Sequence, residues 1–358
     1  MMNNLQIIEQ KVFEDKRISV DEALELFASN DIYTIGKLAA YRCEKLNDKK
    51  VYYIQNCHIN PTNLCVNRCA FCAFSRSTGE QGAYEFSIDE IVDKAVKAQS
   101  QGVRELHIVG GLHPERPFTF YTDLLKRLKA VLPSVHIKAF TAVEIDYFSK
   151  ISGLSLENTL LTLKEAGLET MPGGGAEIFN EAVRNKICPE KISGQRWLEV
   201  AETAHRMGIR TNATMLYGHI ESHADRVDHM ARLREVQDRT GGFQAFIPLP
   251  FHPKNTRLDG GAYTSGIDDL KTIAIARIFL DNVPHIKAYW IMLGEKLAQL
   301  ALYFGADDLE GTVLEEKITH SAGGLTHGAL TRDELIHIIR KAGKEPVERD
   351  SLYKQVGA

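Results

Sequence analysis

The chain has 358 residues, of which 44% are hydrophobic and 25% charged, so it can bury a large core in one domain or two. A formal net charge of −4 gives no basic field, which argues against a nucleic-acid partner. The first residues lack the basic start and long apolar run of a signal peptide, and no apolar stretch is long enough to span a membrane.

Residues 1–48 are predicted to form a helical extension that carries no chemistry. Ser19 and Glu22 have the spacing of a capping box and precede a group of apolar residues, so a helix should begin there. We expect this extension to cover the floor of the main domain.

From residue 51 onward, short apolar runs alternate with amphipathic runs that usually end at a glycine. The short runs predict parallel strands at 51–58, 105–109, 135–141, 168–171, 209–216, 243–249, 285–291 and 309–312. The amphipathic runs predict helices at 88–98, 120–131, 156–166, 193–207, 224–239, 269–280 and 297–304. Such alternation predicts an α/β fold, a (β/α)₈ barrel of the TIM type over residues 49–312. The last strand is the weakest, so a split barrel of six strands is the alternative.

Residues 313–358 are expected to form a C-terminal helical tail that packs on the barrel. Thr331 and Glu334 have capping-box spacing, which predicts the start of a helix in this tail.

Cys65, Cys69 and Cys72 follow the first predicted strand with the spacing C-x₃-C-x₂-C. A four-iron cluster normally takes four thiolates and a structural zinc site takes four ligands, whereas this loop offers three. No second pair of ligands lies nearby in the sequence. The spacing therefore predicts an iron–sulfur cluster with one iron left open for a small molecule. The other cysteines are predicted to be buried free thiols: Cys43, Cys57 and Cys188.

This cysteine motif, with the aromatic Phe71 before its last cysteine, resembles that of the radical S-adenosylmethionine (SAM) superfamily. The resemblance implies a [4Fe-4S] cluster whose open iron binds the amino and carboxylate groups of SAM. It implies that an electron cleaves SAM to methionine and a 5′-deoxyadenosyl radical, and that a donor such as flavodoxin or ferredoxin supplies the electron. The cytoplasm is the expected location, because thiols stay reduced there.

In a barrel of this kind, the chemistry lies in the loops that follow the strands. Gly110 and Gly111 resemble the glycine pair that holds the amino group of SAM, although such a pair by itself is usually a turn. Glu144 could accept hydrogen bonds from ribose hydroxyls, or it could simply be an exposed residue at a helix start. The residues predicted to bind the cofactor are Phe71, Gly110, Gly111, Glu144, Gly173, Gly174, Asn212 and Thr214.

Candidates for substrate binding come from the same loops. Arg68, Arg76, His113 and His252 are predicted to bind carboxylates, since arginine offers a bidentate grip, and Tyr289 could flank an aromatic ring. The acid or base of the reaction is not identified by the sequence. Its candidates are His113, His219 and Glu144.

Longer stretches resemble the family of aminofutalosine synthases, transferases of the futalosine route to menaquinone: P-G-G-G-A-E-I-F, T-N-A-T-M-L-Y-G-H-I-E, F-I-P-L-P-F-H-P and H-I-K-A-Y-W-I-M-L-G. This resemblance implies that the radical adds to 3-[(1-carboxyvinyl)oxy]benzoate. Rearrangement and loss of CO₂ or bicarbonate would give 6-amino-6-deoxyfutalosine. The alternatives are a cyclic dehypoxanthine futalosine synthase, a subunit of a deazaflavin-route (FO) synthase, and a non-catalytic iron–sulfur module with Cys57 as a fourth ligand.

Overall fold

The computed structural model describes residues 4–258, 263–324, 326 and 328–357. Seven parallel strands form one curled sheet in chain order: β2 (Asn56–Ile59), β3 (Glu105–Ile108), β4 (His136–Ala139), β5 (Thr170–Met171), β6 (Arg210–Tyr217), β7 (Phe243–Pro250) and β8 (His285–Ile286). Adjacent strands are in parallel register, so that His58 lies opposite His107 and Thr214 opposite Ile247. Parallel strands joined by crossovers place their carboxyl ends at one face of the sheet. The predicted α/β barrel architecture is confirmed.

The predicted eighth strand is present as β9 (Asp308–Gly311), which brings the two edges of the curled sheet together. Asp308 forms a parallel bridge with Lys287, just beyond β8, and Leu314 forms one with Cys57 of β2. The N–H of His58 also donates to the carbonyl of Leu314 at 2.8 Å. The ring is therefore completed through isolated bridges rather than through a continuous ladder.

The single strand predicted at 51–58 is divided in two by Gln55. Its first half, β1 (Lys50–Ile54), leaves the barrel and forms a small parallel sheet between β9 and β10 (Glu345–Glu348). Gln55 stays between the two sheets because its carbonyl accepts the N–H of Arg104 at 2.9 Å, while its side-chain amide donates to Glu348 at 2.9 Å. The sequence pattern does not predict β10, whose four residues include two glutamates and Pro346.

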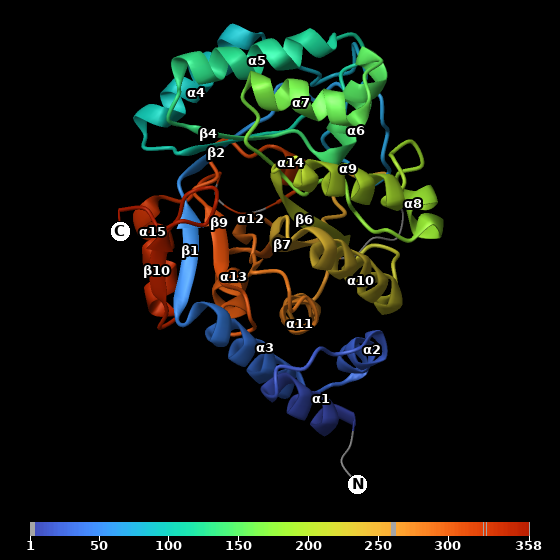
Figure 1. The fold of residues 1–358 in the computed structure, drawn as a ribbon, viewed down its shortest axis with the longest axis vertical. Helices are drawn as coiled ribbons and strands as arrows, with labels where there is room; N and C mark the ends of the chain where they lie inside the picture. The colour runs from blue at the N-terminus through green and yellow to red at the C-terminus, as the bar shows by residue number, and fades with distance from the viewer. Residues whose placement is uncertain (1–3, 259–262, 325, 327, 358) are drawn as a thin grey trace.

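Helices surround the barrel and bury their apolar faces against the sheet (Figure 1). They are α4 (Ile88–Ser100), α5 (Phe118–Val131), α6 (Ala142–Ser152), α7 (Leu156–Ala166), α8 (Glu181–Ile187), α9 (Gly194–Arg206), α10 (His223–Thr240), α11 (Gly266–Phe279), α12 (Trp290–Leu293) and α13 (Glu295–Ala301). A capping box of Ser87 and Glu90 opens α4, in the region where the pattern predicts a helix. Of the helices within the described ranges, none combines the length and apolar character that crossing a membrane requires.

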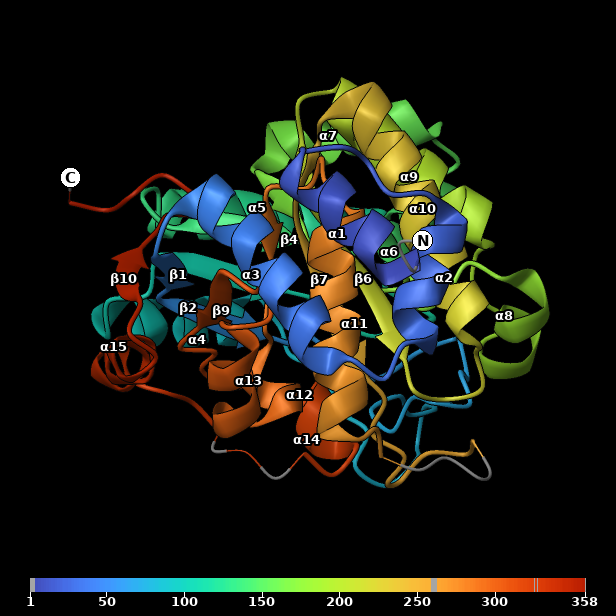
Figure 2. The ribbon, with the colours of Figure 1, turned by 90° about the horizontal axis from the view of Figure 1, so that it is seen from below.

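The N-terminal extension consists of α1 (Asn4–Phe13), α2 (Val20–Ala28) and α3 (Ile32–Asn47), and the predicted capping box opens α2. Helix α3 packs along α11, and α2 packs on α10 and α11 (Figure 2). The extension therefore lies on the flank of the barrel. It also reaches the loops at the floor, through Arg17, which pairs with Asp281 at 3.0 Å, and through Asn47, whose amide donates to Asp307 at 2.7 Å.

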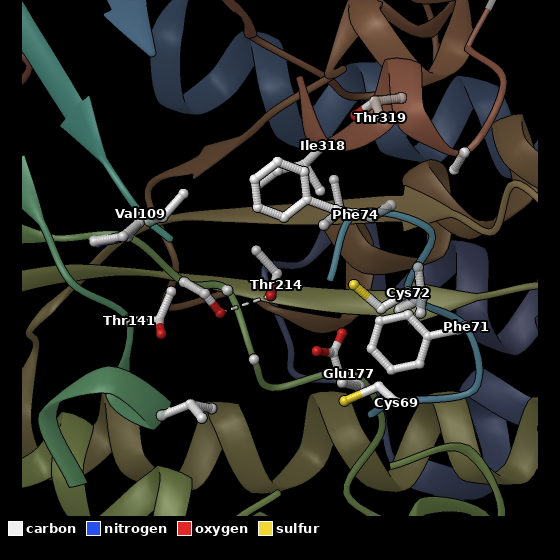
Figure 3. Close-up of a pocket in the computed structure, with 18 of the residues that line it drawn as sticks. Cys69, Phe71, Cys72, Phe74, Val109, Thr141, Glu177, Thr214, Ile318 and Thr319 are labelled. Carbon is white, nitrogen blue, oxygen red and sulfur yellow. Dashed lines mark hydrogen bonds between the residues drawn. The ribbon is translucent and has the colours of Figure 1, made fainter. Parts of the chain in front are cut away.

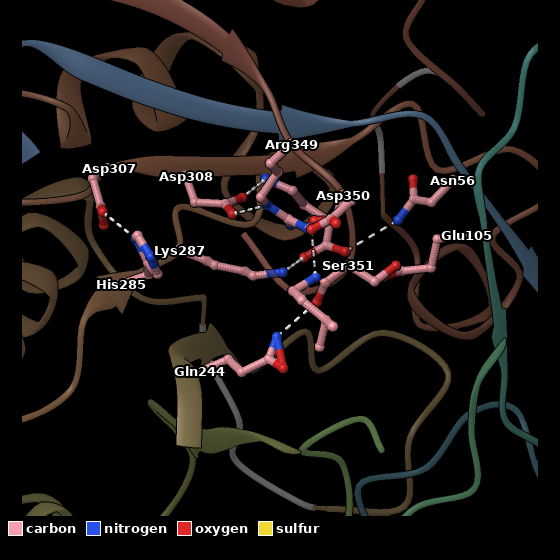
Figure 4. A network of polar contacts seen from close by, with 12 residues as sticks. Asn56, Glu105, Gln244, His285, Lys287, Asp307, Asp308, Arg349, Asp350 and Ser351 are labelled. Atoms are coloured by element: carbon pink, nitrogen blue, oxygen red, sulfur yellow. Dashed lines mark hydrogen bonds and ion pairs between the residues drawn. The ribbon is translucent and has the colours of Figure 1, made fainter. Parts of the chain in front are cut away.

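The end of the C-terminal tail lies across the floor of the barrel. The tail includes α14 (Ile318–Ser321), where Ile318 and Thr319 lie at the opposite side, near the carboxyl ends of the strands, α15 (Arg332–Lys341), which opens at the predicted Thr331 capping box, and β10. Beyond β10, the fully buried Arg349 donates to Asp308 at 2.7 Å, and the carbonyl of Ser351 accepts the amide of Gln244 at 2.7 Å (Figure 4). These contacts reach residues at the amino ends of β7 and β9, on the side opposite the loops.

Candidate active site

A cavity of about 330 Å³ opens at the carboxyl ends of the strands, and most of its surface is apolar (Figure 3). Strands β2, β3, β6 and β7 line it together with the cysteine loop and the glycine run after β5. Most of the residues predicted to bind cofactor or substrate line this cavity: Cys65, Cys69, Phe71, Cys72, Gly110, Gly111, Glu144, Gly173, Gly174, Asn212, Thr214, His252 and Tyr289.

The cysteine loop is held in place by backbone hydrogen bonds to several parts of the chain. The N–H of Cys65 donates to Arg76 at 3.1 Å, and that of Val66 donates to Leu112 at 2.9 Å. The N–H of Ala70 reaches Ile187 at 2.7 Å. These contacts fix the loop that carries the three thiols from three directions.

The three loop cysteines are free thiols, and they fit a metal cluster better than an inert core. Burial raises the pKa of Cys65, and it raises the pKa of Cys69 to about 12, with the Lys191 ammonium acting in the opposite direction. Such thiols lose their protons to a metal, because coordination stabilises the thiolate. Cys57 directly precedes the inward-facing His58 in β2. Unlike His58, it is not among the described residues that line the cavity. The fourth protein ligand required by a non-catalytic module is therefore not supplied by Cys57.

Gly111 lets the end of β3 approach the cysteine loop. A Cβ atom at this position would lie 2.1 Å from the carbonyl oxygen of Leu64, which no side chain can tolerate. The N–H of Gly111 donates to Thr62 at 2.9 Å, and that of Gly110 donates to Glu144 at 3.1 Å. With both amides engaged, the carbonyl oxygens are the backbone groups through which this pair could hold an amino group.

Glu144 is buried, not exposed, and it opens the unpredicted helix α6. Its carboxylate accepts the N–H and hydroxyl of Thr141 at 2.7 and 2.8 Å, in a capping box, besides the amide of Gly110. Burial raises its pKa to about 7 despite these hydrogen bonds. The group therefore changes its ionisation near neutral pH at the cavity wall.

The raised pKa of Glu144 predicts a pH-dependent stability. A carboxyl whose pKa rises from 4.5 to about 7 on folding contributes stability that is complete below pH 4.5 and is lost as pH rises through 7, about 3 kcal/mol in all. We therefore expect Glu144→Gln to remove this loss, so that its thermal melting temperature falls less than that of the wild type between pH 5.5 and 8.5. The exposed Glu165→Gln is the control, and equal slopes for all three proteins would contradict the assignment.

The glycine run after β5 packs closely on β6. A Cβ atom on Gly173 would lie 2.8 Å from the backbone of Asn212 and Ala213. The hydroxyl of Thr214 donates to the carbonyl of Gly173 at 2.6 Å, as Figure 3 shows. As the strand alternation predicts, Asn212, Thr214 and Leu216 all reach the cavity. Thr214 thus fixes the glycine run as well as lining the wall.

Four of the predicted residues do not reach the cavity: Arg68, Arg76, His113 and His219. Arg68 pairs with Glu80 at 3.1 Å, and Arg76 donates to the carbonyl oxygens of Ala73 and Ser75.

The two histidines outside the cavity are also engaged. His113 contacts Glu85 at 3.0 Å and accepts the N–H groups of Glu115 and Arg116, and His219 contacts the carbonyl of Leu216 at 3.1 Å. These four side chains stabilise loops around the site. Of the predicted substrate residues, the structure brings His252 and Tyr289 to the cavity.

Lys191, His107 and Glu310 also line the cavity, as does His58 of β2, and none of these four is predicted from the sequence as a site residue. Lys191 forms a short ion pair with Glu177 and lies 5.0 Å from the centre of the Phe71 ring. Lys191 follows α8 on a loop without periodicity, so no pattern could have indicated it. His58 and His107 could have been found from strand alternation, because each is flanked by apolar residues that face outward.

Comparison with known proteins places these features in context. Residues 59–233 match the model of the radical SAM superfamily, and residues 240–357 match that of the CofH/MqnC C-terminal region. An aminodeoxyfutalosine synthase of Thermus thermophilus is 48% identical, over 98% of this chain and 95% of the relative. A 5-amino-6-(D-ribitylamino)uracil–L-tyrosine 4-hydroxyphenyl transferase of Methanococcoides burtonii is 45% identical, over 86% of this chain and 87% of the relative.

A similar fold occurs in the crystal structure of methylornithine synthase. This structure has a TM-score of 0.77 with 17% sequence identity, and the match covers 95% of this chain and 97% of the other.

Proposed function

The chain belongs to the radical SAM superfamily, and on this premise we propose that it is an aminodeoxyfutalosine synthase. In the proposed reaction, the adenosyl group of SAM is joined to 3-[(1-carboxyvinyl)oxy]benzoate. Rearrangement and loss of one carboxylate as CO₂ or bicarbonate give 6-amino-6-deoxyfutalosine, and methionine is released.

The observation that carries this proposal is the likeness to the Thermus enzyme over nearly the whole of both chains. The cavity supports it, because its walls are mainly apolar, with Phe74, Ile247, Leu249 and Met292 among them. Such walls suit an aryl vinyl ether better than a polyhydroxylated chain, whose hydroxyls would lose their hydrogen bonds to water.

The cluster would be held by Cys65, Cys69 and Cys72, and when bound it would supply the electron that cleaves SAM. The carbonyl oxygens of Gly110 and Gly111 would accept hydrogen bonds from the amino group of SAM, and the carboxylate of Glu144 would accept them from its ribose hydroxyls. We assign Asn212 and Thr214, on another wall of the cavity, to binding the polar edge of the adenosyl group and the acceptor substrate. The apolar walls would exclude water and hydrogen donors from the space between them.

Lys191 adds a positive charge beside the cysteines. Its ammonium is buried, and the carboxylate of Glu177 raises its pKa, so it stays protonated. It lies near enough to Cys69 to lower the pKa of that thiol. We assign Lys191 the role of stabilising negative charge at the cysteine loop, either on the thiolates or on the carboxylate of SAM.

Isotope tracing tests the proposed reaction directly. When SAM labelled in its adenosine is incubated with enzyme, reductant and 3-[(1-carboxyvinyl)oxy]benzoate, the label is expected in one aromatic adenosine product. Free 5′-deoxyadenosine should be the minor labelled species, because addition retains the adenosyl group whereas hydrogen abstraction releases it. Formation of one equivalent of free 5′-deoxyadenosine for each methionine, with no labelled adduct, would contradict the proposal.

A second candidate function is the transfer of a 4-hydroxyphenyl group from tyrosine, favoured by the 45% identity to the Methanococcoides enzyme. The same assay with 5-amino-6-(D-ribitylamino)uracil and tyrosine separates the two. Product from this pair, without product from the vinyl ether, would assign the second function.

A further inference from the structure

Three chemically active side chains meet on the inner face of the barrel, within the strands rather than in the loops after them. His58 of β2 lies opposite His107 of β3, and Glu310 comes from β9, which adjoins β2 on its other side. One donor atom of each residue lies within 4.8 Å of the others, and all three side chains line the cavity. The roles proposed above do not use them.

Both imidazoles have nitrogen atoms without hydrogen-bond partners. Nε2 of His58 and Nδ1 of His107 are buried and have no partner among the described residues, and the His58 residue is only 7% exposed. A buried polar atom left without a partner costs free energy, so its retention points to a ligand.

Glu310 is oriented toward this pair by two further residues. Asn56 donates to one of its carboxylate oxygens at 3.1 Å, and Lys287 forms a short ion pair with the other. Figure 4 shows Asn56 and Lys287 approaching from opposite sides. Hydrogen bonds of this kind commonly fix the ligands of metal sites, and each oxygen keeps a second lone pair for a metal ion.

The charged residues around the cavity do not supply a positive counter-charge for a dicarboxylate substrate. Of the described residues that line it, none is an arginine, and its single lysine, Lys191, is paired with Glu177. Nearby Lys287 is paired with Glu310, and His320 with Glu316 at 2.9 Å. Among the described residues that line the cavity, an incoming carboxylate would therefore meet no arginine and no unpaired lysine.

We propose that His58, His107 and Glu310 bind a divalent transition-metal ion of the Zn²⁺ class. Two imidazoles and one carboxylate form a common catalytic zinc set, with a position left open for a further ligand. Zinc at its usual bond lengths of about 2.0–2.2 Å would hold all three donor atoms, which already lie within 4.8 Å of one another. The open position takes a carboxylate of the substrate and supplies the missing counter-charge; this second part rests on the proposed function.

Zinc binding can be measured without any turnover. The holoenzyme, with its cluster reconstituted anaerobically, is dialysed against micromolar Zn²⁺ and analysed for metal by mass spectrometry. We expect one zinc per chain, with X-ray absorption showing two imidazole ligands and oxygen. His58→Gln and His107→Gln should each weaken the affinity on the order of 100-fold.

The matched control is His205→Gln, since the His205 ring nitrogens lie 2.8 and 2.9 Å from the hydroxyls of Thr240 and Thr211 and are not free. Iron content and circular dichroism check that every variant is folded and carries its cluster. Equal zinc uptake by the wild type, His107→Gln and the control overturns the metal site.

Two further results separate the metal site from the proposed function. Zinc bound through His58 and His107, with no product from the vinyl ether, upholds the site and overturns the function. A raised KM for the vinyl ether in His107→Gln, in protein that binds no zinc, overturns the site and makes the imidazoles direct hydrogen-bond donors to the substrate.

Discussion

Cys69→Ala is expected to abolish the reductive cleavage of SAM. Cys69 is 3% exposed at the cavity wall, on the cysteine loop that the backbone contacts hold rigid. Of the described cysteines, only Cys65 and Cys72 join it in lining the cavity, whereas Cys188, which lies near Cys69, does not line it. Methionine formed from SAM with dithionite as reductant measures the loss, which should be complete, together with the iron bound per chain.

Cys43→Ala is the matched control for this change. Cys43 is buried at the junction of α3 with the barrel, where its thiol weakly contacts the carbonyl of Ala306. It has no path to the cavity, so iron content and cleavage should stay near the wild-type values. Full cleavage by Cys69→Ala would remove the cluster assignment, and with it the reaction that we propose.

Arg349→Met is expected to cost on the order of 3–5 kcal/mol of stability. Arg349 and Asp308 are both fully buried and are joined at 2.7 Å, and the guanidinium also lies 4.3 Å from the centre of the Tyr353 ring. Removing the arginine leaves the Asp308 carboxylate inside the protein without its counter-charge. Urea unfolding followed by circular dichroism at neutral pH measures the change.

The double variant Arg349→Met with Asp308→Leu is the informative companion. Replacing both charges by apolar groups is often close to neutral, so at least half of the lost stability should return. Stability of the single variant equal to that of the wild type would show that the pair contributes nothing, and the tail would then not be a structural part of the floor.

The repeating pattern of the sequence predicts the barrel because each βα unit must bury one apolar stripe. The spacing of the apolar residues along the chain shows this stripe directly. Capping boxes at Ser19 and Thr331 mark helix starts correctly because they too consist of residues close together in the chain. The division of the first strand at Gln55 and the addition of β10 depend on contacts between residues nearly 300 positions apart. Patterns along the chain carry no information about such contacts.

Prediction of the site follows the same division. The glycine pair, the cysteines and the alternate residues of β6 were placed at the cavity because a strand end and its alternation determine where they point. Charge alone marks Arg68 and Arg76 as candidates, and in the structure local acceptors engage both of them. Lys191 and Glu310 belong to the cavity only because distant segments bring them there.

The position of β1 between β9 and β10 bears on how the protein is made. β1 begins at residue 50, yet both of its partners lie beyond residue 307, with Lys50 opposite Glu345. During synthesis, β1 therefore cannot pair with both partner strands until almost three hundred later residues have left the ribosome. Long waits of this kind slow folding and leave strand edges exposed to other chains. Since β9 also completes the ring behind the cysteine loop, a finished pocket for the cluster forms only after translation has passed these residues, so cluster insertion is expected to be a late event that benefits from chaperone protection.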